Sequence, residues 1–129
     1  MAKIKPSSAK SKGRNAQKII AAYIVAQFPE LVADDVVSRP MGSPKCDLIM
    51  SPLAQRIFPV SPESKATKAV PAGNAAEQAR YNAYPNTVPA VIWKRPRTGT
   101  DAGELSVFMC LKDLVELIKI VRAENGKAD

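Results

Sequence analysis

Two acidic side chains and one lysine in the middle of the sequence have types that could act together on a substrate. Asp47 comes just before an apolar run at residues 48–50, and sixteen residues further along Glu63 is separated from Lys65 by a single residue. Carboxylates suit Mg²⁺, a hard cation that prefers oxygen ligands and keeps several of its waters. A lysine beside them can orient an attacking water and offset the charge that develops on a phosphate. The combination indicates metal-dependent phosphodiester hydrolysis.

This chemistry requires secondary-structure elements that bring the three side chains together. Residues i and i+2 of an extended strand point to the same face, so Glu63 and Lys65 could both face one ion. The spacing to Asp47 is long enough for one strand, a connection and a second strand that lies beside the first. Each part alone is weak evidence, because an aspartate at a strand end is usually a turn residue and Glu-x-Lys is common on solvated surfaces. The three residues together carry more weight.

The composition is that of one domain with a basic surface. The 129 residues are 46% hydrophobic, which is enough for a core, and 19 basic against 12 acidic residues give a formal charge of +7. This balance favours a polyanionic partner, nucleic acid before a membrane. No apolar run is long enough to cross a bilayer, and no apolar segment directly follows the basic N-terminus as a signal peptide requires. We therefore expect a cytoplasmic protein without a membrane partner.

The absence of histidine narrows the chemistry. With no histidine in the sequence, serine–histidine and cysteine–histidine triads, histidine-bound zinc and histidine general bases are excluded. The two cysteines, Cys46 and Cys110, form no metal-ligand spacing, and we expect both to be buried thiols in a reducing compartment. Catalysis by this chain would therefore run on carboxylates, lysine and a metal ion.

A first helix is expected over residues 14–28. Ile20, Ile24 and Phe28 recur at four-residue spacing, which is typical of an apolar helix face. Gln17 falls on the same inward face, near the start of the helix. From periodicity alone, this glutamine is a partly exposed first-turn residue rather than a group aimed at a site.

The rest of the chain is expected to alternate between short strands and helices. Pro59 and Pro62 interrupt the third strand, so this strand should be an edge strand or be bulged, because proline cannot donate to a sheet ladder. The strands are expected at residues 34–38, 46–50, 58–65, 88–93 and 105–111, the helices at 74–84 and 114–121, and a short turn or helical segment at 53–57. This order predicts an α/β fold, with a small mixed five-stranded sheet flanked by helices.

The domain organisation follows from the same pass along the chain. Residues 1–12 are rich in lysine, serine and alanine and lack periodicity, which predicts a disordered basic arm. Residues 13–123 form the single folded domain, and residues 124–129 form a polar tail.

The order of several segments resembles a known nuclease family. Asp47 and its strand lead into Ser51-Pro52-Leu53-Ala54-Gln55-Arg56, then Phe58-Pro59 precedes Glu63-Ser64-Lys65. Earlier matches are Lys12-Gly13-Arg14, Gln17 and Ser38–Gly42, and later matches lie at residues 77–79, 88–95 and 111–114. In this order the chain, over residues 12–118, is similar to the phage-encoded nucleases of the PD-(D/E)xK superfamily that are called Holliday junction resolvase-like.

The resemblance implies a restriction-endonuclease-like core, a divalent ion (Mg²⁺ or Mn²⁺) and an endonuclease that cleaves branched or otherwise structured DNA. It also implies the host-cell cytoplasm as the location. The implied site consists of Asp47 and Glu63 as metal ligands, aided by the backbone carbonyl of Ser64, with Lys65 as the catalytic lysine and Gln17 and Gln78 beside them. Gln17 stands where the superfamily often has an acidic residue, and Gln78 matches a glutamine found near the site in many members.

The basic residues are the expected contacts with the phosphate backbone, which makes binding sensitive to salt. These residues are Arg14, Arg56, Lys94, Arg95 and Arg97. For Arg56 an ordinary surface position is an equally good interpretation. A two-fold homodimer would suit a symmetric junction, although no residue pattern indicates one.

Two other functions stay open at this point. The same fold could serve as a nucleic-acid-binding module with weak or lost catalysis, which the neutral Gln17 and the proline at position 62 favour. Alternatively, the chain could be a small structural or regulatory basic protein whose Glu63 and Lys65 lie on a solvated surface.

Overall fold

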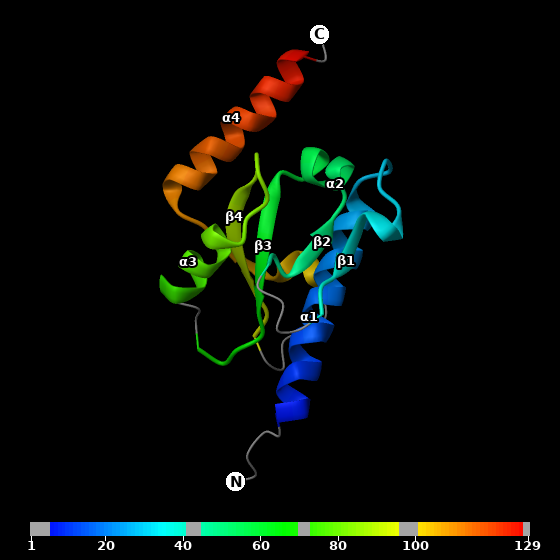
Figure 1. Ribbon diagram of the computed structural model, residues 1–129, viewed down its shortest axis with the longest axis vertical. Coiled ribbons are helices and arrows are strands. Elements are labelled where there is room, and N and C mark those ends of the chain that lie inside the picture. The colour runs from blue at the N-terminus through cyan, green and yellow to red at the C-terminus, as the bar shows by residue number, and fades with distance from the viewer. Residues whose placement is uncertain (1–5, 41–44, 70–72, 96–100, 128–129) are drawn as a thin grey trace.

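A computed structural model describes residues 6–40, 45–69, 73–95 and 101–127 (Figure 1). Within these ranges, four α-helices and five strands follow one another in nearly the predicted order. They are α1 (Pro6–Gln27), β1 (Val36–Ser38), β2 (Leu48–Met50), α2 (Pro52–Ile57), β3 (Val60–Lys65), α3 (Gly73–Tyr81), β4 (Val88–Trp93), β5 (Ser106–Phe108) and α4 (Leu111–Lys127). Short 3₁₀ turns at Ala33–Asp35 and Ala102–Glu104 precede β1 and β5. The fold is mixed α/β, as the sequence predicts.

The prediction of one five-stranded sheet is wrong. The strands form an antiparallel β1–β2 pair and a separate three-stranded sheet of order β3-β4-β5. In the second sheet β3 and β4 are parallel, with Glu63 opposite Val91, and β5 runs antiparallel to β4. The sheet divides between β2 and β3 because side chains, rather than a backbone ladder, link these two strands.

Strand β3 lies at the edge of its sheet, which agrees with the expectation from its prolines. Pro62 is opposite Ala90 in the parallel register. An edge strand tolerates proline, because one of its sides makes no ladder hydrogen bonds.

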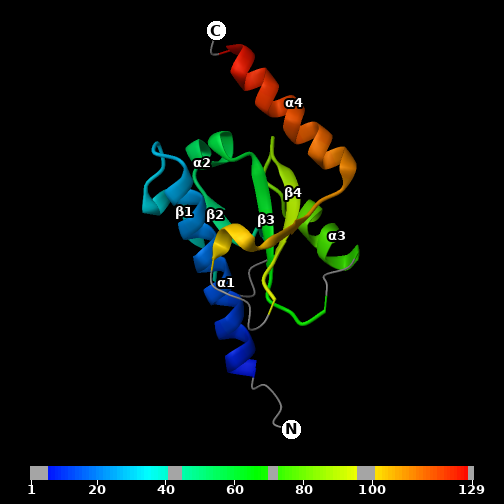
Figure 2. The ribbon, with the colours of Figure 1, turned by 180° about the vertical axis from the view of Figure 1, so that it is seen from behind.

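Helices cover both faces of the three-stranded sheet (Figures 1 and 2). Ile92 packs in one cluster with Ile20 and Ile24 of α1, whereas Val91 packs on the other face with Ala75 and Ala79 of α3. Successive strand residues point to opposite faces. On β3, Glu63 and Lys65 therefore share the α3 side, and Ser64 points to the α1 side.

The first helix is longer than the sequence pattern indicates. It begins at Pro6 rather than near Arg14, so residues 6–12, expected as part of a disordered arm, are helical. Proline is well suited to the first turn of a helix, where its missing N–H has no partner to lose. The expectation for residues 1–5 lies outside the described residues.

The C-terminal helix packs differently from the prediction. Leu117 and Ile120 contact the cluster of Val60, Val88 and Ala90. The apolar positions that marked this helix in the sequence are 41–50% exposed; they are Leu114, Val115, Ile118 and Val121. Helix α4 therefore extends beyond the sheet, with only one strip of its surface packed on the body (Figure 1).

None of the described helices is both long and apolar enough to cross a bilayer.

Candidate functional site

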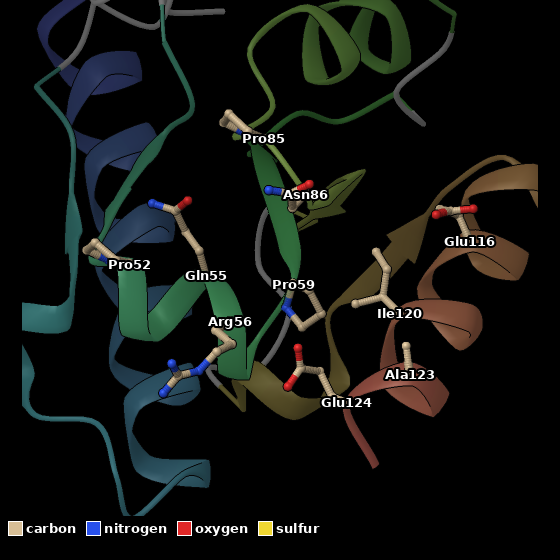
Figure 3. A pocket seen from close by; sticks show the side chains of 10 residues that line it. All are labelled: Pro52, Gln55, Arg56, Pro59, Pro85, Asn86, Glu116, Ile120, Ala123 and Glu124. Atoms are coloured by element: carbon tan, nitrogen blue, oxygen red, sulfur yellow. The ribbon is translucent and has the colours of Figure 1, made fainter. Parts of the chain in front are cut away.

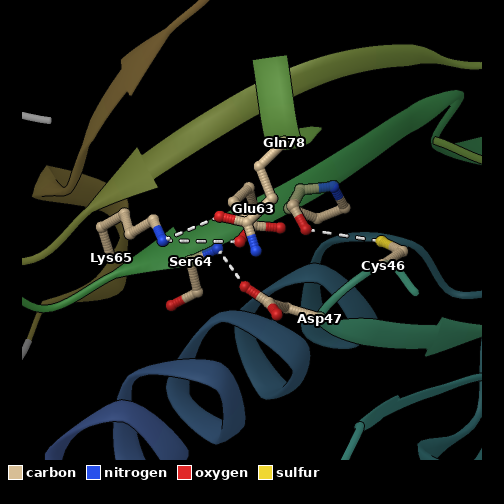
Figure 4. Close-up of polar contacts among 7 residues, drawn as sticks. Cys46, Asp47, Glu63, Ser64, Lys65 and Gln78 are labelled. Carbon is tan, nitrogen blue, oxygen red and sulfur yellow. Dashed lines mark hydrogen bonds and ion pairs between the residues drawn. The ribbon is translucent and has the colours of Figure 1, made fainter. Parts of the chain in front are cut away.

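The candidate site lies where β2 begins and β3 ends (Figure 4). Asp47 directly precedes β2, and its carboxylate oxygen Oδ2 accepts a hydrogen bond from the Ser64 N–H at 2.7 Å. Nearby, the buried thiol of Cys46 donates to the Pro62 carbonyl at 3.4 Å. These two contacts hold the start of β2 against the end of β3. The acidic residues that the sequence singled out therefore lie side by side.

Lys65 reaches both Glu63 and the neighbouring helix. Its Nζ lies 3.6 Å from Glu63 Oε1 and donates to Gln78 Oε1 of α3 at 3.3 Å. The side chains of Glu63 and Lys65 meet because they are two residues apart on one strand. Gln78 links the lysine to α3.

Burial raises the pKa values of both carboxyl groups. Glu63 is 3% exposed, and desolvation, followed by the negative charge of Asp47, raises its pKa from 4.5 to about 7 although Lys65 opposes the rise. Desolvation also raises the pKa of Asp47, against the Ser64 N–H and the charges of Lys65 and Arg39. Two acids that are hard to ionise together form a place where a bound cation would be stabilising.

The oxygen donors present suit a hard divalent ion, although they are few. Asp47, Glu63 and the Ser64 carbonyl would supply ligands to Mg²⁺, which commonly uses one or two carboxylates and retains water. The Ser64 hydroxyl is buried and has no hydrogen-bond partner in the described part of the chain, so a water molecule could fill that position. No group of three or more His, Cys, Asp or Glu side chains within the described ranges is arranged to hold a metal. The chemistry of the donors fits the ion, with water completing the set.

Gln17 is buried at the inner side of α1. It is 4% exposed, and its amide oxygen accepts a hydrogen bond from the Ser38 hydroxyl at 2.6 Å. Ser38 pairs with Leu48, the residue after Asp47. The glutamine thus joins α1 to β1 close to the site. The expectation of a partly exposed first-turn residue is wrong for Gln17, because α1 starts earlier.

Basic side chains lie at the same end of the sheet as Lys65. The Lys94 N–H donates to the Lys65 carbonyl at 2.8 Å, and the Arg95 guanidinium lies 5.0 Å from the centre of the Trp93 ring. Parallel strands end at the same edge of a sheet, so these two residues border the site. Arg14 is exposed on α1, one turn before Gln17, and its guanidinium contacts Ser11. The expected contact Arg97 falls outside the described residues.

Arg56 does not lie with the others. It lines a groove of about 520 Å³ between α2 and α4, near Pro59 at the start of β3 (Figure 3). Glu116 and Glu124 line the same groove. The six residues of β3 separate this groove from Lys65 by roughly 20 Å. The structure therefore does not bring Arg56 to the site.

The cysteines differ from each other. Cys46 is buried, as expected, and its desolvation raises the pKa of the thiol to about 11. Cys110 is exposed, so its predicted burial is wrong. It directly precedes α4, whose first residue, Leu111, is also exposed.

Sequence reasoning gave no role to two residues that border the site. Arg39 donates to the Cys46 carbonyl, and Tyr84 bonds to the backbone of β2. Arg39 lies in the Ser38–Gly42 segment that contributes to the resemblance, and this is the one feature of the sequence that could have drawn attention to it. Nothing in the local pattern around Tyr84 indicates its contacts, because its partners are 34 and 36 residues away.

Comparison of the chain with protein-family models, curated proteins and solved structures found no match.

Proposed function

We propose that this protein is an Mg²⁺-dependent endonuclease that hydrolyses phosphodiester bonds in DNA. The observation that carries the proposal is the meeting of Asp47, Glu63 and Lys65 where β2 and β3 diverge, with the Ser64 N–H on Asp47 and the Lys65 ammonium near Glu63. This arrangement joins two neighbouring carboxylates to one cation in a chain that has no histidine.

Each residue has a distinct task in the proposed reaction. Asp47, Glu63 and the Ser64 carbonyl would hold Mg²⁺, which would supply a bound water of lowered pKa and a positive charge beside the phosphate. Lys65 orients the attacking water and offsets the negative charge that grows on the phosphate oxygens. Gln78 holds the Lys65 ammonium from α3, which limits the positions that the lysine can take.

The proposed DNA contacts lie around this end of the sheet. Lys94 and Arg95 follow β4 directly, and Arg14 lies on α1. Phosphate contacts of this kind release counterions, so affinity should fall steeply as salt increases. We propose branched or otherwise structured DNA as the substrate on the resemblance to Holliday junction resolvase-like nucleases alone.

The direct test is cleavage of a four-way junction and of linear duplex DNA with and without Mg²⁺. We expect Lys65→Ala to lower the rate by about 10²–10³-fold, the loss typical of one electrostatic contact to the reacting phosphate. Asp47→Asn should abolish the Mg²⁺ response. Lys119→Ala, on exposed α4, is the matched control and should cleave like the wild type. Full activity in Lys65→Ala or Asp47→Asn would reject the proposal.

A second candidate is a DNA-binding module without effective catalysis. It is favoured by Gln17, whose amide oxygen is engaged by Ser38 and which adds no negative charge to the two carboxylates. Salt-sensitive DNA binding without metal-dependent cleavage of either substrate would decide for this candidate. Absence of both DNA binding and Mn²⁺ binding would instead support a structural or regulatory role.

A further inference from the structure

Beyond the contacts of Cys46 and Asp47 with β3, a tyrosine hydroxyl binds the side of β2 that faces β3. Tyr84 Oη donates a hydrogen bond to the Leu48 carbonyl at 2.8 Å and accepts one from the Met50 N–H at 3.2 Å. These are backbone groups of β2 that a neighbouring strand would otherwise engage, and β2 has no ladder with β3. The hydroxyl thus replaces a strand on this side of β2.

The same hydroxyl accepts a hydrogen bond from Arg39, which also binds the backbone on both sides of Asp47. Arg39 Nη2 donates to Tyr84 Oη at 3.1 Å, and Arg39 Nε donates to the Cys46 carbonyl at 2.7 Å. The backbone N–H of Arg39 donates to the Asp47 carbonyl at 2.9 Å. The peptide groups on both sides of Asp47 are therefore bound by one residue.

We infer that Arg39 and Tyr84 are positioning residues, which fix the backbone of Asp47 so that its carboxylate faces Glu63. The catalytic part of this inference rests on the proposed nuclease function. The geometric part does not, because it concerns where the Asp47 carboxylate is held.

Arginine and tyrosine suit this task for stereochemical reasons. A guanidinium carries donors that point in different fixed directions, so Nε and Nη2 can serve Cys46 and Tyr84 together, whereas lysine has one donor atom. A tyrosine hydroxyl has one donor and two acceptor positions. All three are used, by Leu48, Met50 and Arg39.

Tyr84 is itself fixed from a different part of the fold. Its backbone N–H donates to the Ser61 hydroxyl at 2.9 Å, and its carbonyl accepts from the Thr87 hydroxyl at 2.7 Å. Ser61 belongs to β3, the strand that carries Glu63 and Lys65. The tyrosine therefore ties the position of Asp47 on one sheet to the strand with its two partner residues on the other.

The test compares Tyr84→Phe with Tyr81→Phe, the same change at a side chain that is 87% exposed on α3. Two measurements are made on the full chain: Mn²⁺ affinity by calorimetry, and hydrogen exchange of the Ser64 amide, which donates to Asp47. In Tyr84→Phe we expect roughly tenfold weaker Mn²⁺ binding, the low end for residues that orient metal ligands. Ser64 amide protection should fall about tenfold, as expected when one hydrogen bond is weakened, while β4 amides keep theirs.

Arg39→Lys provides a second variant that keeps the positive charge near Asp47. We expect it to behave like Tyr84→Phe, because the lost property is the direction of the donors rather than the charge. If Tyr84→Phe does not fold, Arg39→Lys decides alone.

The outcomes separate the two proposals. Ser64 protection and Mn²⁺ affinity equal to those of Tyr81→Phe in both variants would overturn the positioning role, even if both variants melt at lower temperature. If the wild type itself binds no Mn²⁺, the metal-dependent function fails, and the Ser64 amide still shows whether Arg39 and Tyr84 hold Asp47.

Discussion

Replacing Glu63 by glutamine should make the protein more stable at neutral and alkaline pH. The pKa of Glu63 is raised from 4.5 to about 7, mainly because the carboxyl is desolvated and secondly because Asp47 is near. The folded protein therefore binds this proton more tightly than the unfolded chain does. The resulting stabilisation is fully present below pH 4.5 and is lost as the pH rises through about 7. A shift of this size corresponds to about 3 kcal/mol at pH 8.

Glu63→Gln retains the shape of the protonated side chain and removes the titration. We expect the variant to match the wild type near pH 4.5 and to exceed its free energy of unfolding by about 3 kcal/mol at pH 8. The pKa of Asp47 is also raised. Ionisation of Asp47 therefore adds to the stability that the wild type loses as the pH rises. The opposing attraction of Lys65 is already included in the Glu63 pKa.

Urea denaturation at the two pH values measures this difference. The single tryptophan, Trp93, is 5% exposed in the folded protein and reports unfolding through its fluorescence. Glu77→Gln, an exposed change on α3, is the control and should leave the pH dependence unaltered. Added Mg²⁺ at pH 8 should stabilise the wild type and not Glu63→Gln. If Glu63→Gln is no more stable than the wild type at pH 8, the two carboxylates are not strained by burial and the argument for a cation between them fails.

Three further predictions concern other parts of the fold. Arg80→Ala should lower the free energy of unfolding in urea by about 2 kcal/mol, because the buried Asp113 carboxylate loses its bidentate partner. An unchanged urea midpoint would contradict this. Ser51→Ala removes the hydroxyl that caps α2 and should cost about 1 kcal/mol in the same assay, and a loss below a few tenths would show that the cap is dispensable. A thiol reagent should label Cys110 rapidly and Cys46 slowly in the folded protein, because one is exposed and the other is buried with a pKa of about 11; Cys110→Ser should then remove the fast reaction, and its persistence would show that Cys46 is accessible.

The parts of the fold that depend on local pattern were predictable from the sequence. Strand β4 occupies residues 88–93, as its continuous apolar run indicates, and its six residues are all buried. The edge position of β3 follows from proline chemistry, and β5 pairs with β4, the strand that precedes it in the sequence. These features need no knowledge of distant residues.

The parts that depend on distant side chains were not predictable. A continuous sheet and a divided one require the same strand patterns, and here Tyr84 binds β2 where a neighbouring strand would, across 34 and 36 residues. The sequence marks both Arg56 and Lys65 as candidate phosphate contacts. It does not show that they lie at opposite ends of β3. Sequence spacing therefore predicts which residues could meet, whereas contacts between distant side chains determine which of them do.

The parallel pairing of β3 with β4 has a consequence for when the chain can fold during synthesis. Glu63 lies opposite a residue twenty-eight positions later, and the Asp47 carboxylate depends on an amide seventeen positions away. During synthesis, Asp47, Glu63 and Lys65 are all added to the chain before β4, the strand that pairs with the one carrying Glu63 and Lys65. Contacts this remote in sequence form late, because long loops must close first. We therefore expect Asp47, Glu63 and Lys65 to stay apart in the nascent chain until the domain is nearly complete.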